Sequence, residues 1–233
     1  MHLKTCTITG ADNNTNIDDL IRLSEKFPFV EWGILMYDRK CGVPRYPSYG
    51  WIDNLLKITE RYDMNLALHL CGDYVDQFVK MDKGFCKYIN NQPFKRVQLN
   101  FSYPVSKFKF IDLYKAVHGA LSIQKTIITQ HNYENKYIYS ILENFQNYAV
   151  LFDTSGGNGI LPNEWPEPFS KKMCGYAGGI APDNVEKVLE TINSLVGESQ
   201  PIWIDLESGV RTNDVFDIVK VENVLSIAGK YVM

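Results

Sequence analysis

The chain has 233 residues, of which 45% are hydrophobic and 22% are charged. This composition is typical of a globular protein and excludes a disordered or fibrous chain. The formal net charge is −3, and no basic stripe appears, so we do not expect a nucleic-acid partner. No run of 18 apolar residues occurs, so we expect no membrane-spanning segment.

The cysteines and the N-terminus indicate the compartment. Five scattered cysteines, an odd number, fit a reducing environment better than a disulfide framework. The first residues, Met1 to Cys6, contain no long apolar core of the kind found in a signal peptide. We therefore expect a cytoplasmic protein. Its expected partner is a small anionic molecule, and the sequence leaves open whether the chain is a monomer or a homodimer.

Eight short runs rich in apolar and β-branched residues predict strands. They are Thr5–Thr9, Glu31–Met36, Leu66–Cys71, Arg96–Phe101, Thr126–His131, Ala149–Asp153, Lys172–Ala177 and Ile202–Glu207. Successive runs begin 23 to 35 residues apart, which leaves room for a loop and a helix after each strand.

Three of the intervals show the apolar spacing of a helix, at residues 18–25, 51–58 and 182–189. The last of these begins with a proline and an acid, as first helical turns often do. Alternating strands and helices are typical of parallel βαβ units. Eight units predict a protein of the α/β class, a single (β/α)8 TIM barrel with parallel strands, rather than an open doubly wound sheet. No Pro/Ser-rich linker divides the chain, so we expect one domain over residues 1–233.

Active sites of such barrels lie at the C-terminal ends of the strands. Polar residues are frequent at the predicted ends, which carry Thr9, His69, Asn100, Gln130, Asp153, Asp205 and Glu207. For any one of them, simple exposure to water at a strand end is the alternative explanation.

Glycines follow the seventh and eighth predicted strands, at Gly178-Gly179 and at Ser208-Gly209. Glycines at such a place, before a helix, expose backbone N–H groups that bind anions. In many barrels the loops after these two strands hold a substrate phosphate. The sequence therefore predicts that the N–H groups of these four residues converge on one phosphate.

Several motifs occur along the chain in the same order as the motifs of a known family. They are Val43-Pro44-Arg45, Val97-Gln98-Leu99-Asn100, Asp153-Thr154 with Gly156-Gly157-Asn158-Gly159, Ala177-Gly178-Gly179-Ile180-Ala181-Pro182-Asp183-Asn184-Val185, and Asp205-Leu206-Glu207-Ser208-Gly209-Val210. Together they resemble, over nearly the whole chain, the motifs of phosphoribosylanthranilate isomerase, a barrel family of the tryptophan pathway.

The resemblance implies an isomerase that performs an Amadori-type rearrangement on a small anionic, phosphorylated sugar derivative without a cofactor. It implies that Asp153 is the general acid that opens the ribose ring. It also implies that Arg45 holds a substrate carboxylate and that Asp205 lines the pocket. Asn100, which stands where the family has histidine, is our third expected substrate-binding residue. The phosphate cradle would again be Gly178, Gly179, Ser208 and Gly209.

Two further positions depart from the family pattern. The family's base is a cysteine directly before glycine at the end of the first strand, and here Thr9 precedes the glycine. Cys6 lies three residues earlier and therefore faces the opposite side of the strand. Glu207 stands where the family has serine. A second proton carrier is then needed, and we expect Glu207 or His69, whose ordinary pKa suits neutral pH.

Four alternatives remain open at this point. Two concern the function: the chain is a diverged lyase or epimerase that uses Asp153 with Glu207 or His69, or it is a non-catalytic ligand-binding barrel. Two concern single residues: Asp153 is only a cap of the loop that follows it, or Arg45 is only a surface residue that pairs with an acid. His69 and Cys71 share a strand face, but no second ligand pair accompanies them, so we predict no metal site.

Overall fold

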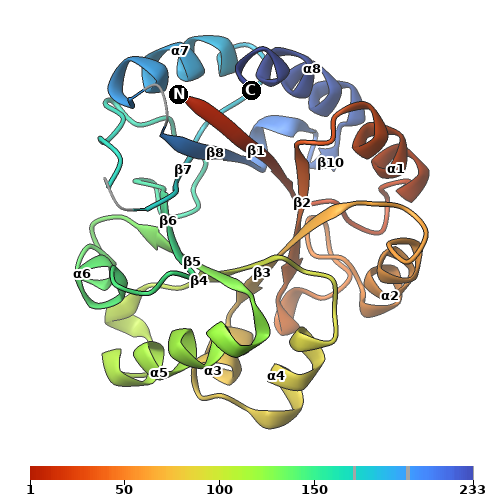
Figure 1. Ribbon diagram of the computed structural model, residues 1–233. Coiled ribbons are helices and arrows are strands. Elements are labelled where there is room, and N and C mark those ends of the chain that lie inside the picture. The colour runs from red at the N-terminus through yellow and green to blue at the C-terminus, as the bar shows by residue number, and fades with distance from the viewer. Residues whose placement is uncertain (170–171, 198–199, 233) are drawn as a thin grey trace.

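The computed structural model describes residues 1–169, 172–197 and 200–232. Its main sheet is a closed barrel in which the strands follow one another in chain order from β1 to β8, all parallel (Figure 1). The strands are β1 His2–Thr9, β2 Val30–Met36, β3 Asn65–Cys71, β4 Arg96–Asn100, β5 Thr126–His131, β6 Tyr148–Phe152, β7 Cys174–Ala177 and β8 Pro201–Leu206. The predicted fold is confirmed, and the strand boundaries differ from the prediction by three residues at most.

Helices form a ring outside the barrel (Figure 1). They are α1 Ile17–Lys26, α2 Tyr49–Ile58, α3 Asp73–Val79, α4 Lys83–Asn90, α5 Phe110–Ala120, α6 Ile138–Leu142, α7 Val185–Leu195 and α8 Ile218–Ala228. None of the described helices is long and apolar enough to cross a membrane.

Local sequence explains where these helices begin. The Asn16 side chain accepts a hydrogen bond from the Asp18 N–H and so caps α1, whose buried stripe contains Leu20 and Leu23. The helix predicted from residue 182 begins later, at Val185, because the preceding residues form a turn in which Asn184 accepts a hydrogen bond from the Ala181 N–H.

The connection from β6 to β7 departs from the predicted alternation, since no helix occurs in its described residues, 153–169 and 172–173. Gly156, Gly157 and Gly159 have positive φ angles of 63°, 88° and 65°, which a helix does not accommodate. Prolines follow at positions 162, 166 and 168. Instead, Trp165 packs edge-on against Tyr176 at a centroid distance of 5.9 Å, so the irregular loop covers this side of the barrel.

Two apolar clusters form the core. The larger lies between strands and helices, and the smaller contains Ala149, Leu151 and Trp203. Strand alternation predicts that Ala149 and Leu151 face the interior while Val150 and Phe152 face the helices, and the two clusters divide the residues in this way.

A polar layer lies inside the barrel below the mouth, near the N-terminal ends of β2 and β4. Arg96 donates from Nε to Glu31 Oε2 at 2.9 Å and from Nη2 to Thr7 Oγ1 at 2.7 Å. The same guanidinium lies 4.6 Å from the ring centroid of Trp203. These groups fill the floor of the barrel, so any ligand site must lie above them.

Candidate functional site

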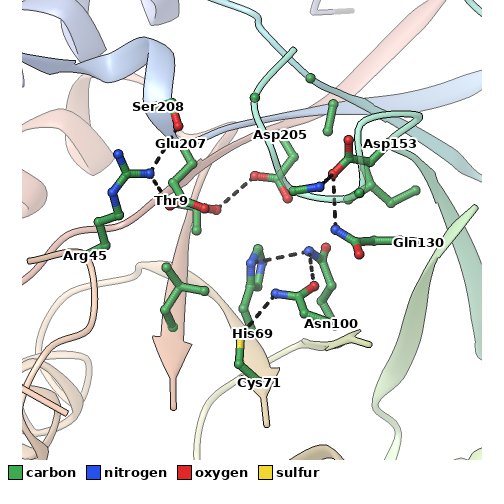
Figure 2. Close-up of a pocket in the computed structure, with 18 of the residues that line it drawn as sticks. Thr9, Arg45, His69, Cys71, Asn100, Gln130, Asp153, Asp205, Glu207 and Ser208 are labelled. Carbon is green, nitrogen blue, oxygen red and sulfur yellow. Dashed lines mark hydrogen bonds and ion pairs between the residues drawn. The ribbon is translucent and has the colours of Figure 1, made fainter. Parts of the chain in front are cut away.

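A cavity of about 760 Å³ opens at the C-terminal ends of the strands (Figure 2). Every site residue expected from the sequence lines it, namely Arg45, His69, Asn100, Asp153, Gly178, Gly179, Asp205, Glu207, Ser208 and Gly209. The fold therefore brings together residues that are up to 164 positions apart in the chain.

Asp205, in β8, is paired with Thr9, the last residue of β1. The Thr9 hydroxyl donates to Asp205 Oδ1 at 2.8 Å, and the aspartate is only 7% exposed. Burial raises the pKa of Asp205 to about 8, against the opposing effects of the Thr9 hydrogen bond and of Arg96. Asp205 therefore holds a proton at neutral pH.

Asp153 directly follows β6 and accepts three hydrogen bonds. The donors are the Ser155 hydroxyl at 2.8 Å, the Gly157 N–H at 2.7 Å and the Gln130 side-chain amide at 3.2 Å. Two of these donors belong to the loop after β6, so the aspartate caps that loop while its side chain also borders the cavity. The alternative in which Asp153 caps the loop after it is therefore present, and its role in catalysis stays a prediction.

His69, in β3, is 2% exposed and lies beside Gln98, whose amide nitrogen is 3.4 Å from His69 Nδ1. Burial, with a smaller effect of Arg96, lowers the pKa of His69 to about 3, so the ring is neutral and weakly basic at neutral pH. Gly33 makes room for this arrangement, because a Cβ at that position would lie 2.2 Å from Thr9 Oγ1 and 3.0 Å from the His69 ring.

Asn100 continues the same polar row across the cavity floor. Its side-chain oxygen accepts from Gln98 at 3.0 Å, and its nitrogen donates to Cys71 Sγ at 3.5 Å (Figure 2). Burial raises the pKa of the Cys71 thiol to about 11, which keeps it protonated. Among the described residues, no group of three or more His, Cys, Asp or Glu side chains is arranged to hold a metal ion.

Arg45, in the loop after β2, points toward Glu207 and Ser208 (Figure 2). Its Nη1 donates to Glu207 Oε1 at 2.8 Å and to Ser208 Oγ at 3.1 Å, and its Nε donates to Asp214 Oδ1 at 2.8 Å. The alternative in which Arg45 pairs with an acid is therefore present, although the side chain also lines the cavity.

The sequence reasoning missed the groups that hold this corner. Arg211 donates to Asp12 Oδ2 at 2.9 Å and to Asp214 Oδ1 at 3.2 Å. Strands β9 (Arg211–Thr212) and β10 (Val215–Phe216) form a hairpin that brings Asp214 close to the two arginines. Its two turn residues, Asn213 and Asp214, have positive φ angles of 50° and 59°. The Asn-Asp pair between two short strands was the one available signal, since type I′ turns favour these residues.

The four residues expected to bind phosphate follow the neighbouring strands β7 and β8, and all of them line the cavity. Gly178 and Gly179 have φ angles of 111° and 64°, and a Cβ at Gly209 would lie 2.0 Å from the Ile180 carbonyl oxygen. Glycine is therefore required at these positions for the backbones to approach closely. Within the described part of the chain, the backbone N–H groups of all four residues lack a hydrogen-bond acceptor.

Comparison with known proteins gives a partial sequence match. A family model described as N-(5′phosphoribosyl)anthranilate (PRA) isomerase matches residues 111–226. The N-(5′-phosphoribosyl)anthranilate isomerase of Oceanobacillus iheyensis is 31% identical over 80 residues, which are 33% of this chain. The match spans 35%, about a third, of the length of that relative.

Solved structures match over nearly the whole chain. The phosphoribosyl anthranilate isomerase from Thermococcus kodakaraensis has a TM-score of 0.55 at 14% identity and covers 97% of this chain and 99% of its own. The N-(5′-phosphoribosyl)anthranilate isomerase from Pyrococcus furiosus has a TM-score of 0.58 at 15% identity and covers 98% and 100%. At these identities the structures support the fold. In sequence over its C-terminal half, and in fold over its whole length, the chain resembles the phosphoribosylanthranilate isomerases.

Proposed function

We propose that the chain is an isomerase of the phosphoribosylanthranilate isomerase type, which performs an Amadori-type rearrangement on a small, phosphorylated sugar that carries an N-linked group. The observation that carries the proposal is that Asp153 and Asp205 reach one cavity from β6 and β8 in different hydrogen-bonding environments. An isomerisation needs one group that donates a proton and another that accepts one. Two carboxyl groups with contrasting environments provide such a pair.

Asp205 is the group that we assign as the general acid. It is protonated at neutral pH, with a pKa of about 8, and the hydrogen bond from Thr9 fixes its orientation. Its proton goes to the ring oxygen of the sugar. The bond between C1 and that oxygen breaks, and the nitrogen lone pair forms the C1=N bond of an iminium ion.

Asp153 is the group that we assign as the general base, because its oxygens act as acceptors for three donors. It takes the C2 proton, and the C2–H electrons form the C1=C2 bond of an enolamine and neutralise the nitrogen. C1 then gains the proton from Asp153, and the C2 hydroxyl returns a proton to Asp205. The product is a ketone, and this assignment reverses the role that the family resemblance implies for Asp153.

The remaining candidates suit proton transfer less well. His69 is a weak base at neutral pH because burial lowers its pKa to about 3. Glu207 is bound to Arg45 at 2.8 Å. The low pKa of His69 and the pairing of Glu207 with Arg45 disfavour the lyase or epimerase alternative, because that alternative needs His69 or Glu207 as the partner of Asp153.

Free backbone N–H groups support the proposal that the substrate carries a phosphate. The cavity lining includes Gly178, Gly179, Ser208 and Gly209. Backbone N–H groups of such residues bind an anion by donating hydrogen bonds, and no cationic side chain is required. A phosphate on this side would direct the sugar ring toward Asp153 and Asp205.

In the test, the substrates form in solution from a sugar phosphate and an amine. Ribose 5-phosphate condenses with anthranilate or 2-aminobenzamide to give N-glycosylamines, and nuclear magnetic resonance detects the ketoamine product. We expect turnover by the wild type with at least one amine, and a loss of about 100-fold or more in Asp153→Asn and Asp205→Asn. Cys6→Ser is the matched control, because Cys6 is fully buried in the outer core. Absence of ketoamine with both amines would refute the proposal and favour a ligand-binding barrel.

A further inference from the structure

Arg45 is half-buried and lines the cavity beside the hairpin of β9 and β10, and the N–H donors of its guanidinium are largely occupied. A guanidinium has five N–H donors. Nε donates to Asp214, and Nη1 donates to both Glu207 and Ser208. Within residues 1–169, 172–197 and 200–232, only the N–H groups of Nη2 have no acceptor. A carboxylate that binds an arginine with both oxygens needs parallel N–H groups on two nitrogens, and no such pair remains free on Arg45.

The charges around Arg45 also oppose a further anion. Arg45 and Arg211 contact three carboxylates, those of Asp12, Asp214 and Glu207. The hydrogen bond with Arg45 holds the pKa of Asp214 below its usual range, which keeps that group ionised. The two arginines are thus already shared among three carboxylates, which opposes the binding of an added carboxylate at Arg45.

This pairing is held in place from the backbone. Arg45 has a φ angle of 75°, which is unusual for a residue other than glycine, and its N–H donates to Asp12 Oδ2 at 2.8 Å. That same oxygen accepts from Arg211, which is 6% exposed. Gly10 lets the groups approach, because a Cβ there would lie 3.3 Å from Glu207 Cγ and 3.2 Å from Arg211 Nη1.

We propose that Glu207 occupies the anion position of Arg45, so that the N-linked group of the substrate carries hydrogen-bond donors and no carboxylate. This inference rests on the proposed isomerase function and names the class of substrate. Glu207 Oε1 accepts from Arg45, and within the described part of the chain no hydrogen bond reaches the second carboxylate oxygen, so this residue of the cavity lining keeps one acceptor. An amide, an amine or an amidine on the substrate satisfies that acceptor, whereas a carboxylate does not.

The experiment compares two stable probes that differ in a single group. Reductive amination of ribose 5-phosphate with 2-aminobenzamide or with anthranilate gives two ribitol phosphates, one with a carboxamide and the other with a carboxylate. Calorimetry measures the Kd of each for the wild type, Glu207→Ala and Glu222→Gln. Glu222 is the matched control, since it also pairs with cations, Arg22 at 3.0 Å and Lys26 at 2.7 Å, but does not line the cavity.

We expect the wild type and Glu222→Gln to bind the carboxamide probe about tenfold more tightly than the carboxylate probe. In Glu207→Ala the order reverses, because Arg45 becomes free to bind the carboxylate. Tighter binding of the carboxylate probe by the wild type would overturn this inference and leave the isomerase proposal intact. An unchanged order in Glu207→Ala would also overturn it. If neither probe binds the wild type, the isomerase proposal fails as well.

Discussion

Replacement of Asp205 by asparagine should change how the stability of the protein depends on pH. The pKa of this carboxyl is raised from 3.8 to about 8 in the folded state, mainly by burial. Between those two pH values the folded chain keeps a proton that the unfolded chain has released. Unfolding therefore releases a proton, and the wild type loses stability as the pH rises through this range.

The magnitude follows from the size of the pKa change. One proton released on unfolding corresponds to a loss of about 1.4 kcal/mol for each pH unit. Over the whole interval this reaches an upper limit of about 6 kcal/mol, which relaxation of the pocket or entry of water would reduce. Asp205→Asn preserves the shape of the side chain and removes the titration.

Urea unfolding of both proteins at several pH values between 4 and 9 provides the measurement. The free energy of unfolding of Asp205→Asn, minus that of the wild type, should increase from pH 4 to about pH 8 and be constant above it. Titrating groups that do not interact with Asp205 are common to both proteins and cancel in this difference. A difference that does not change with pH would refute the argument that Asp205 is buried with its proton.

Three further substitutions test particular contacts by urea unfolding. Gly33→Ala should cost about 1–3 kcal/mol of unfolding free energy, because the new Cβ would lie 2.2 Å from Thr9 Oγ1. The control Gly50→Ala, in α2 with no atom within 4 Å of the new Cβ, should instead stabilise the fold. An equal loss of stability in both variants would contradict the argument. Glu31→Gln should cost about 3 kcal/mol, because it removes the negative charge that pairs with the largely buried guanidinium of Arg96. A loss below about 1 kcal/mol would mean that the arginine reaches water. Burial lowers the pKa of His69 from 6.5 to about 3, so the wild type should lose stability as the pH falls through this range; His69→Gln should lack that loss, and parallel curves would contradict the assignment.

The barrel could be predicted from the sequence because each strand is a short apolar run at a regular interval. The same regularity concealed the irregular connection after β6. Its length allowed a helix, whereas the glycines and prolines between positions 156 and 168 prevented one. Composition within the interval was therefore more informative than its length.

The position of the site followed from the fold, but the chemistry of its residues did not. His69 was a reasonable base by its ordinary pKa, and its burial beside Gly33 and Gln98 became visible only in three dimensions. The pairing of Arg45 with Glu207 joins residues 162 positions apart, and Asp214 enters through a two-residue turn. No local pattern in the sequence specifies which of several acids an arginine will contact.

The most direct test of the account is the pH dependence of kcat/KM for ketoamine formation by the wild type. Since Asp205 donates the first proton and has a pKa of about 8, kcat/KM should fall by about tenfold for each pH unit above this value. Asp205→Asn should lack this decrease in its residual activity. A profile that instead rises through pH 8 would contradict the account, because it would show that Asp205 acts as the base.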